Sequence, residues 1–199
     1  QLANNISVEL NIEGNPFAPA MKSSRGDVSD YPGFMELIRE IKPAQCTLVP
    51  DGNEQLTSDH GFDLIASGEK LKPVIDELLA LGVRVSLFMD PDIEQIKLAV
   101  KLGAHRVELY TEAYADAVLH NKNIDAVLKQ YIDAANAATE VGLGVNAGHD
   151  LNLTNLRQFK SAIPQLLEVS IGHAFTVDCI EIGLVSAVNA YQQTLGKKT

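Results

Sequence analysis

The sequence predicts an α/β protein of the (β/α)8 TIM-barrel class, of which about six βα units are present. Six short segments rich in apolar and β-branched residues alternate with amphipathic stretches whose apolar residues have helical spacing. Polar or ionisable residues stand at the carboxyl ends of several strand-like segments, and in a barrel these ends meet on one face. The alternation also fits a doubly wound sheet, but the polar strand ends favour the barrel.

The strand-like segments cover residues 7–12, 45–49, 84–89, 106–110, 143–147 and 168–171. The helical pattern covers residues 68–81, 92–102, 125–141, 154–163 and a long final stretch, 175–191. Leu-Gly pairs end two of these helices, as left-handed caps do, and short connections lead to the next strand, as in parallel βαβ units. Because a closed barrel needs eight strands, we expect two further βα units on the N-terminal side.

Residues 1–199 are predicted to form one barrel domain, because 199 residues with 46% hydrophobic content supply one substantial core. Within it, residues 14–30 have loop composition and no regular period. We interpret this segment as a surface insertion or a lid loop. Its Lys22 and Arg25 are either solvated charges or contacts to an anion.

Composition argues against several classes of protein. Sixteen Lys and Arg against 26 Asp and Glu give a formal net charge of -10, which repels nucleic acid. No apolar run reaches the roughly 18 residues of a membrane span, and residues 1–5 are too polar for a signal peptide, so we expect a cytoplasmic protein without a membrane partner. Cys46 and Cys179 lie far apart in apolar segments and suggest neither a disulfide nor a metal site.

Two carboxylates are expected inside the barrel. In the first strand-like segment Leu10 and Ile12 share one face, and Asn11 and Glu13 share the other, which in a barrel points inward. The same alternation in the fourth segment directs Glu108 inward. Burial raises the pKa of a carboxyl group toward values useful for a general base. Both residues are therefore catalytic candidates, with a structural ion pair or, for Glu13, an exposed strand end as the alternative.

Further candidates stand at other strand ends. Arg106 shares the face of Glu108 and offers it a structural partner. His149 follows the fifth segment, at the tip of the strand, where it is either a proton-transfer residue or an ordinary surface histidine. Gly172 precedes the final helical stretch, so it is either part of a phosphate-binding helix start or a tight turn. Thr57 is either an anion contact or a turn or N-cap residue.

Several ordered blocks resemble the pyridoxine 5'-phosphate synthase family. The blocks are Asn11-Ile12-Glu13, Lys42-Pro43, Thr47-Leu48-Val49-Pro50, Glu54-Gln55-Leu56-Thr57, Val85-Ser86-Leu87-Phe88-Met89-Asp90, Val107-Glu108-Leu109-Tyr110-Thr111 with Tyr114-Ala115, Val145-Asn146-Ala147-Gly148-His149 and Ser170-Ile171-Gly172-His173-Ala174. One block alone is a weak signal. All of them in this order cover most of the chain from residue 7 onward and make a specific match.

The resemblance implies condensation of 1-deoxy-D-xylulose 5-phosphate with 3-amino-1-hydroxyacetone 1-phosphate to pyridoxine 5'-phosphate, phosphate and water. It also implies a homo-octamer built as a tetramer of dimers, with no metal or organic cofactor. By the same resemblance Glu13 is the base, His149 the proton donor and Glu108 the carboxylate that steadies cationic or polar intermediates. The substrate-binding residues it implies are Thr57, Asp150, Gly172 and His173.

The chain also departs from the family pattern. The family's N-terminal Asn-x-Asp-His block is not in this sequence, and Asp150 stands where the family usually has glycine after the histidine. A carboxylate there would repel a phosphate group. Two alternatives remain open: another phosphosugar-binding barrel enzyme, such as an aldolase or epimerase, and a noncatalytic barrel homologue without the N-terminal part of the site.

Overall fold

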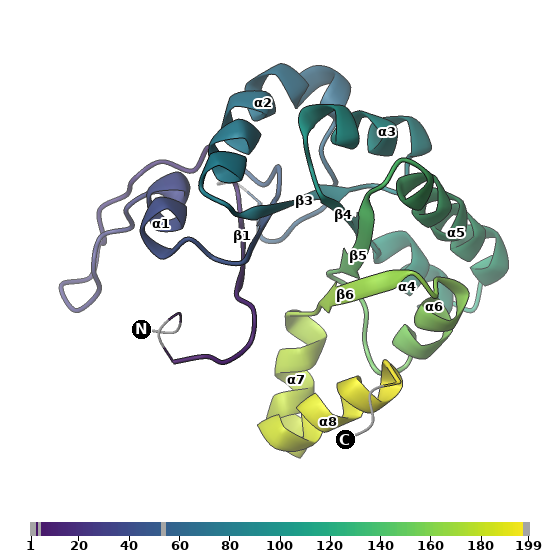
Figure 1. The fold of residues 1–199 in the computed structure, drawn as a ribbon. Helices are drawn as coiled ribbons and strands as arrows, with labels where there is room; N and C mark the ends of the chain where they lie inside the picture. The colour runs from purple at the N-terminus through teal and green to yellow at the C-terminus, as the bar shows by residue number, and fades with distance from the viewer. Residues whose placement is uncertain (1–2, 4, 53–54, 197–199) are drawn as a thin grey trace.

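Six parallel strands form one curved sheet in the order β1-β2-β3-β4-β5-β6, with helices on its outer side (Figure 1). The computed structural model describes residue 3 and residues 5–52 and 55–196. Each strand pairs with the next along the chain, which is the connectivity of consecutive βα units in a barrel. The predicted fold class is therefore confirmed, with β1 and β6 as the edges of the described sheet.

The strands are β1 (Asn11–Gly14), β2 (Gln45–Leu48), β3 (Arg84–Met89), β4 (Arg106–Tyr110), β5 (Gly144–Gly148) and β6 (Leu166–Ser170). The helices are α1 (Phe34–Ile41), α2 (Leu64–Ala80), α3 (Ile93–Leu102), α4 (Glu112–Leu119), α5 (Ile124–Glu140), α6 (Leu156–Ala162), α7 (His173–Ile182) and α8 (Leu184–Thr194).

The first predicted strand, 7–12, is wrong in its position. β1 begins only at Asn11, whose register partner is Gln45, the first residue of β2. The amide of Gln45 still donates to the carbonyl of Leu10 at 3.1 Å, and there the pairing with β2 ends. Residues before Leu10 therefore lie beyond the start of their partner strand, and alternation alone does not form a strand without one. The other five strands were predicted to within three residues at either end.

The helices differ from the prediction in two respects. The sequence reading omitted α1 and α4, which are only eight residues long each. The long helix predicted over 175–191 is broken into α7 and α8 at Gly183, whose φ of 85° and ψ of 148° are not helical. The predicted cap after α3 is confirmed, because Gly103 has a left-handed φ of 97°.

The outward faces of the strands and the inward faces of the helices form the hydrophobic core. Val85, Leu87 and Met89 of β3 and Val107 and Leu109 of β4 are completely or almost completely buried there. The opposite face of the strands carries polar side chains into the barrel interior. This division confirms the inward direction predicted for alternate residues, and it places the candidate site.

Residues 15–33 form a loop that projects beside α1 (Figure 1). An antiparallel bridge between Met21 and Tyr31 closes its base. Arg25, which the sequence offered as an anion contact, instead pairs with Asp27 inside the loop at 2.7 Å. The segment lies largely at the surface, and its role as an insertion or as a lid stays a prediction.

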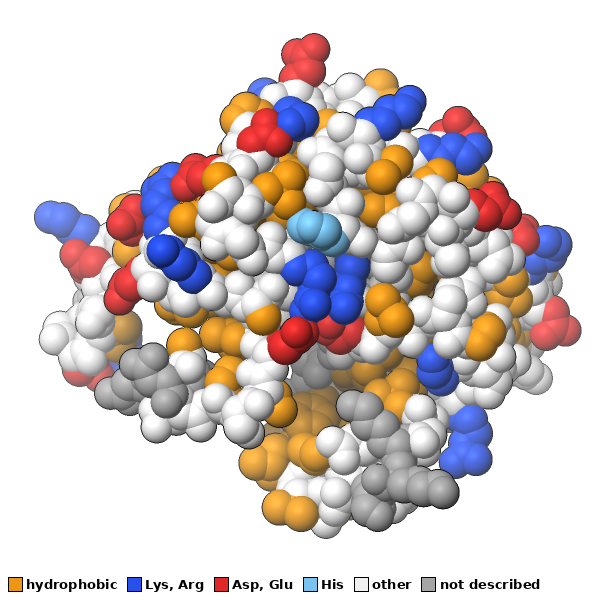
Figure 2. Space-filling model, viewed as in Figure 1, with side chains coloured by type: hydrophobic (Ala, Val, Ile, Leu, Met, Phe, Trp, Pro, Cys, Tyr) orange, Lys and Arg blue, Asp and Glu red, His pale blue; other side chains and the backbone are white. Residues whose placement is uncertain are grey.

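The helices α7 and α8 carry exposed apolar side chains. Every residue of α7 remains at least partly exposed. In Figure 2 hydrophobic side chains gather on the lower part of the visible face, over these helices. The exposed apolar residues of the two helices are Val177, Ile180, Ile182, Leu184 and Val185. In the part of the chain that the structure describes, no helix is long and apolar enough to cross a membrane.

Candidate active site

A pocket of about 530 Å³ opens at the carboxyl ends of the strands. Its lining comes from four of the six strands, β1, β3, β4 and β6, and from residues that follow strands β2, β5 and β6. The residues that line it are Asn11, Glu13, Asp51, Thr57, Ser58, Phe88, Glu108, His149, Glu168, Ser170, Ile171, Gly172 and His173. Six of the seven predicted site residues are therefore brought together, and Asp150 lies next to the pocket behind His149. Glu54, which belonged to one of the family blocks, lies outside the described residues.

Glu13 lies on β1 and reaches the pocket from the sheet edge. Its side chain keeps access to solvent through the pocket mouth, yet the protein around it still raises the pKa of the carboxyl group by removing water. The negative charge of Asp51 raises that pKa further, and His149 lowers it. A carboxyl group with a raised pKa is a stronger base than an ordinary one, which suits proton abstraction near neutral pH.

Glu108 lies deeper in the pocket and is only 1% exposed. Its Oε2 accepts a hydrogen bond from Ser170 Oγ at 3.0 Å and a weaker one from Thr47 Oγ1 at 3.5 Å. Burial raises the pKa of Glu108 well above its ordinary value, and the nearby carboxylate of Glu13 adds to the effect. Burial therefore favours the neutral form of the Glu108 carboxyl group over the ionised form.

His149 directly follows β5, and both nitrogens of its imidazole ring contact polar side chains. Nδ1 lies 2.9 Å from Asp150 Oδ2, and Nε2 lies 2.5 Å from Thr57 Oγ1. The ring also makes an edge contact with Tyr110 and one with His173, with centroids 5.5 Å and 5.8 Å apart. The hydrogen bond to Asp150 raises the pKa of His149, while burial opposes it. These contacts favour a protonated ring that faces the pocket.

Gly172 immediately precedes α7, which begins at His173. The first amide groups of a helix have no intrahelical partner, and with the helix dipole they favour an anion. A Cβ on Gly172 would meet no atom within 4 Å, so the space in front of this turn is open. The turn therefore leaves open space next to the first amide groups of α7.

Asp51 is a pocket carboxylate that the sequence reading missed. Its Oδ2 accepts a hydrogen bond from Ser58 Oγ at 2.6 Å, whereas its Oδ1 is buried and receives none from the described residues. It follows β2 in a loop, where no strand alternation indicates the direction of a side chain. One signal in the sequence could have indicated Asp51: it directly follows the family block that ends at Pro50.

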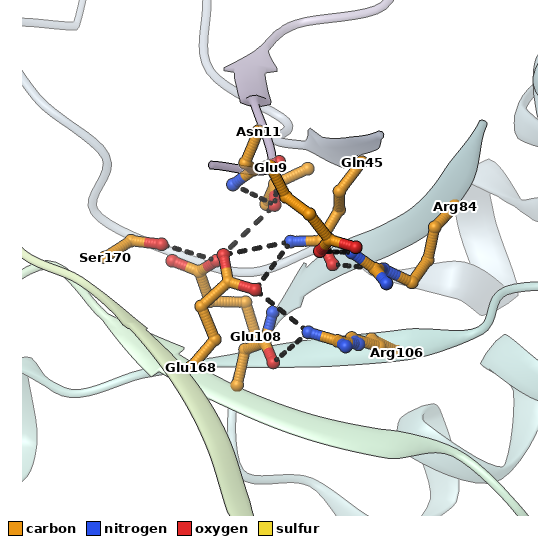
Figure 3. A network of polar contacts seen from close by, with 10 residues as sticks. Glu9, Asn11, Gln45, Arg84, Arg106, Glu108, Glu168 and Ser170 are labelled. Carbon is orange, nitrogen blue, oxygen red and sulfur yellow. Dashed lines mark hydrogen bonds and ion pairs between the residues drawn. The ribbon is translucent and has the colours of Figure 1, made fainter. Parts of the chain in front are cut away.

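An ionic network forms the floor of the pocket (Figure 3). Arg106 binds Glu168 at 2.9 Å and Asn146 at 3.2 Å, so the pairing of Arg106 with Glu108 considered from the sequence is wrong. Gln45 joins the same network through two contacts to Glu168. Arg106 therefore pairs with Glu168 and not with Glu108. Among the described residues, the carboxyl group of Glu108 has no cationic partner.

Among the described residues, no group of three or more His, Cys, Asp or Glu side chains has the arrangement of a metal site. The carboxyl groups of Glu13 and Asp51 and the imidazole of His149 instead line one pocket. Together they offer groups that can accept a proton from a bound molecule and deliver a proton to it.

The fold and the pocket define the class: an α/β-barrel enzyme with acid and base groups at the carboxyl ends of its strands. A family model described as "Pyridoxal phosphate biosynthesis protein PdxJ" matches residues 1–197. The chain belongs to this family.

Curated relatives agree with the assignment, and one solved structure is similar in fold. A pyridoxine 5'-phosphate synthase of Xylella fastidiosa is 48% identical over 188 residues, which cover 94% of this chain and 69% of the relative. One from Xanthomonas campestris pv. campestris is 49% identical over 184 residues, covering 92% and 69%. The BexX/CysO complex of Amycolatopsis orientalis is similar in fold alone, with a TM-score of 0.52 at 15% identity over 81% of this chain and 58% of that one.

Proposed function

We propose that this protein condenses 1-deoxy-D-xylulose 5-phosphate with 3-amino-1-hydroxyacetone 1-phosphate and closes the ring of pyridoxine 5'-phosphate, with release of phosphate and water. The observation that carries the proposal is the meeting of Glu13, Glu108 and His149 in one pocket beside the α7 turn. The names of the relatives supply the product.

Ring closure requires repeated removal and delivery of protons at neighbouring carbons and leaving oxygens. Glu13 takes the part of the base, because its raised pKa makes the carboxylate a stronger proton acceptor. His149 takes the part of the proton donor, because its raised pKa keeps the imidazole charged at higher pH. Two groups with different roles are needed, since a single residue cannot be protonated and deprotonated at the same step.

Glu108 is placed to steady a cationic or polar intermediate deep in the pocket. A buried neutral acid becomes a favourable carboxylate only when a positive charge forms next to it. Condensation of an amine with a ketone produces such a charge. Binding of the intermediate then ionises Glu108, and the proton that it releases passes to another base in the pocket.

The two substrates each carry a phosphate group. We assign one of these groups to the amides at the start of α7, next to Gly172 and His173, where open space and the helix dipole favour an anion. Thr57 contributes a hydroxyl contact to the deoxyxylulose phosphate. The side chain of Asp150 points to His149 and its amide donates to Thr111 Oγ1 at 3.3 Å, so any contact of Asp150 with substrate stays a prediction.

Three further parts of the proposal concern the protein as a whole. We propose that it works without a metal or organic cofactor, since acid and base groups alone suffice for the condensation. We also propose a cytoplasmic location and a homo-octamer assembled from dimers. The exposed apolar side chains of α7 and α8 support assembly, because patches of this kind commonly mark contact surfaces.

The test is an assay of the purified protein, as its gene encodes it, with both phosphorylated substrates and with each one alone. Pyridoxine 5'-phosphate should appear only when both are present. Consumption of the sugar phosphate alone would instead indicate an aldolase or epimerase. If the folded protein forms no product in any of these assays, the remaining interpretation is the noncatalytic homologue.

A further inference from the structure

His149 has a backbone conformation that residues with a Cβ rarely adopt. Its φ is 86°, in the left-handed region that favours glycine. Its amide nevertheless donates to the carbonyl of Ser170 at 3.0 Å, which fixes the main chain in this conformation next to β6. Non-glycine residues are held in this region mainly where the surrounding structure imposes it, and such positions cluster at functional sites.

This backbone places the His149 ring between a carboxylate and a hydroxyl group. Asp150 Oδ2 lies at 2.9 Å from Nδ1, on the side away from the pocket, and Thr57 Oγ1 lies at 2.5 Å from Nε2, on the pocket side. The ring itself is largely enclosed, with its side chain 14% exposed. Asp150, His149 and Thr57 therefore form one continuous line of polar contacts that ends in the pocket.

The main chain of Asp150 is itself held in position by two side chains. Its carbonyl accepts a hydrogen bond from Asn155 Nδ2 at 3.2 Å, and its amide donates to Thr111 Oγ1 at 3.3 Å. Asn155 and Thr111 are both buried, with exposures of 2% and 0%. The carboxylate of Asp150 thus approaches Nδ1 from a backbone that is fixed on both sides.

We infer that Asp150 is a positioning residue that sets the protonation and orientation of His149, so that the Nε2 proton of the ring faces Thr57 and the pocket. The inference deepens the proposed function, because it assigns a source for the proton that His149 delivers. It also gives position 150 a role that requires no contact with substrate.

The direction of proton transfer follows from the geometry. Nδ1–H donates to the Asp150 carboxylate, so the proton that leaves the imidazolium is the one on Nε2. Transfer of this proton to a substrate oxygen leaves a neutral ring with its hydrogen on Nδ1, still bonded to Asp150. The ring is then ready to accept a proton at Nε2 and return to its starting state.

Other charged and titratable groups also face His149, and they do not cancel the effect of Asp150. They are Glu13 from β1, Asp51 from the loop after β2, Tyr110 from β4 and His173 from α7. Glu13 and Asp51 act in the same direction as Asp150, and the hydrogen bond to Asp150 is the largest contribution to the raised pKa of His149.

The test is an NMR titration of the His149 imidazole in the ligand-free protein and its variants. In Asp150→Asn, which keeps an acceptor for Nδ1–H and removes the charge, the pKa of His149 should fall. In Asp150→Gly it should also fall, and the ¹⁵N shifts of the neutral ring should show a smaller share of the Nδ1–H tautomer. A titration midpoint unchanged in both variants would overturn the inference.

The matched control is Asp116→Asn, which removes a carboxylate from another Asp–His pair, the exposed one with His120 at 3.0 Å. It should leave the titration of His149 unchanged. Activity gives a second readout: in Asp150→Asn the alkaline limb of the kcat profile should move to lower pH, with a loss of about tenfold or more at pH 8 and a smaller one at pH 6. A limb that stays in place would contradict the inference. If the wild-type protein forms no product, the proposed function fails, while the NMR titration still decides the role of Asp150.

Discussion

Glu108 on β4 and Gly148 on β5 lie diagonally across neighbouring strands, and the carboxyl group of Glu108 occupies the space where a side chain at 148 would begin. A Cβ added to Gly148 would lie 2.5 Å from Glu108 Oε1 and 2.5 Å from the carbonyl oxygen of Ser170. Real Cβ atoms do not approach other atoms so closely. The glycine before His149 therefore makes room for the buried acid of the pocket.

We expect Gly148→Ala to displace Glu108 and to strain the contact between β5 and β6. The unfolding free energy should fall by about 1–3 kcal/mol, the usual cost of overpacking, and turnover should fall with it. Chemical denaturation and steady-state kinetics measure the two effects. Gly26→Ala is the control, because a Cβ there meets no atom within 4 Å. Equal stability of Gly148→Ala and wild type would show that the close approach does not matter.

Gly172→Ala should separate ligand binding from folding. No protein atom lies within 4 Å of the added Cβ, so denaturation curves should match those of the wild type. The methyl group would occupy the open space before α7, and the KM for one phosphorylated substrate should rise about tenfold, the effect of about 1.4 kcal/mol of lost binding. An unchanged KM for both substrates would remove this turn from phosphate recognition.

Glu108→Gln should change how stability depends on pH. Because the folded pKa of Glu108 is raised above the unfolded value of about 4.3, the native state binds more protons than the unfolded state between these two pKa values. Wild-type stability contributed by this group therefore falls as pH rises through that window, by about 1.4 kcal/mol for each pH unit. The glutamine variant lacks this loss, so its stability relative to wild type should increase as pH rises above the unfolded pKa of the glutamate. Parallel stability curves would show that Glu108 is already ionised.

The floor of the pocket should contribute to stability more than a surface ion pair does. Arg106→Met leaves the partly buried carboxylate of Glu168 without its cation, and we expect the unfolding free energy to fall by about 1–3 kcal/mol. Arg25→Met breaks the exposed pair with Asp27 and should leave the denaturation midpoint unchanged. Equal effects of the two substitutions would contradict a structural role for the floor.

Glu13→Gln should keep the fold and lose most turnover. The side chain faces the pocket, so an isosteric amide disturbs little packing, while the loss of a general base lowers kcat on the order of a hundredfold or more. Glu69→Gln, on the exposed face of α2, is the matched control and should retain wild-type activity. Wild-type turnover in Glu13→Gln would remove Glu13 from the role of base.

Much of the fold could be predicted because burial imposes regular patterns. The alternation of Val107, Glu108 and Leu109 indicated which side chain enters the barrel, and the structure buries all three accordingly. The break at Gly183 was missed because the apolar pattern continues across it, although a glycine with a positive φ, here 85°, readily ends a helix. The late start of β1 depends on the length of its partner strand, which is a tertiary property.

The site was predictable in part for the same reason. Glu13 and Glu108 lie on strands, where alternation gives a direction, and they reach the pocket as expected. Asp51 lies on a loop, and its direction depends on the hydrogen bond from Ser58. The pairing of Arg106 with Glu168 rather than Glu108 depends on strand stagger across two neighbours, which the sequence of one strand does not reveal.

The central claim is that this one pocket joins two phosphorylated molecules and expels a single phosphate. The most direct test measures inorganic phosphate and pyridoxine 5'-phosphate together as the purified protein turns over both substrates. We predict that the two products accumulate in equal amounts from the first turnover and that neither forms when one substrate is left out. Phosphate released without the ring product, or from one substrate alone, would contradict the account.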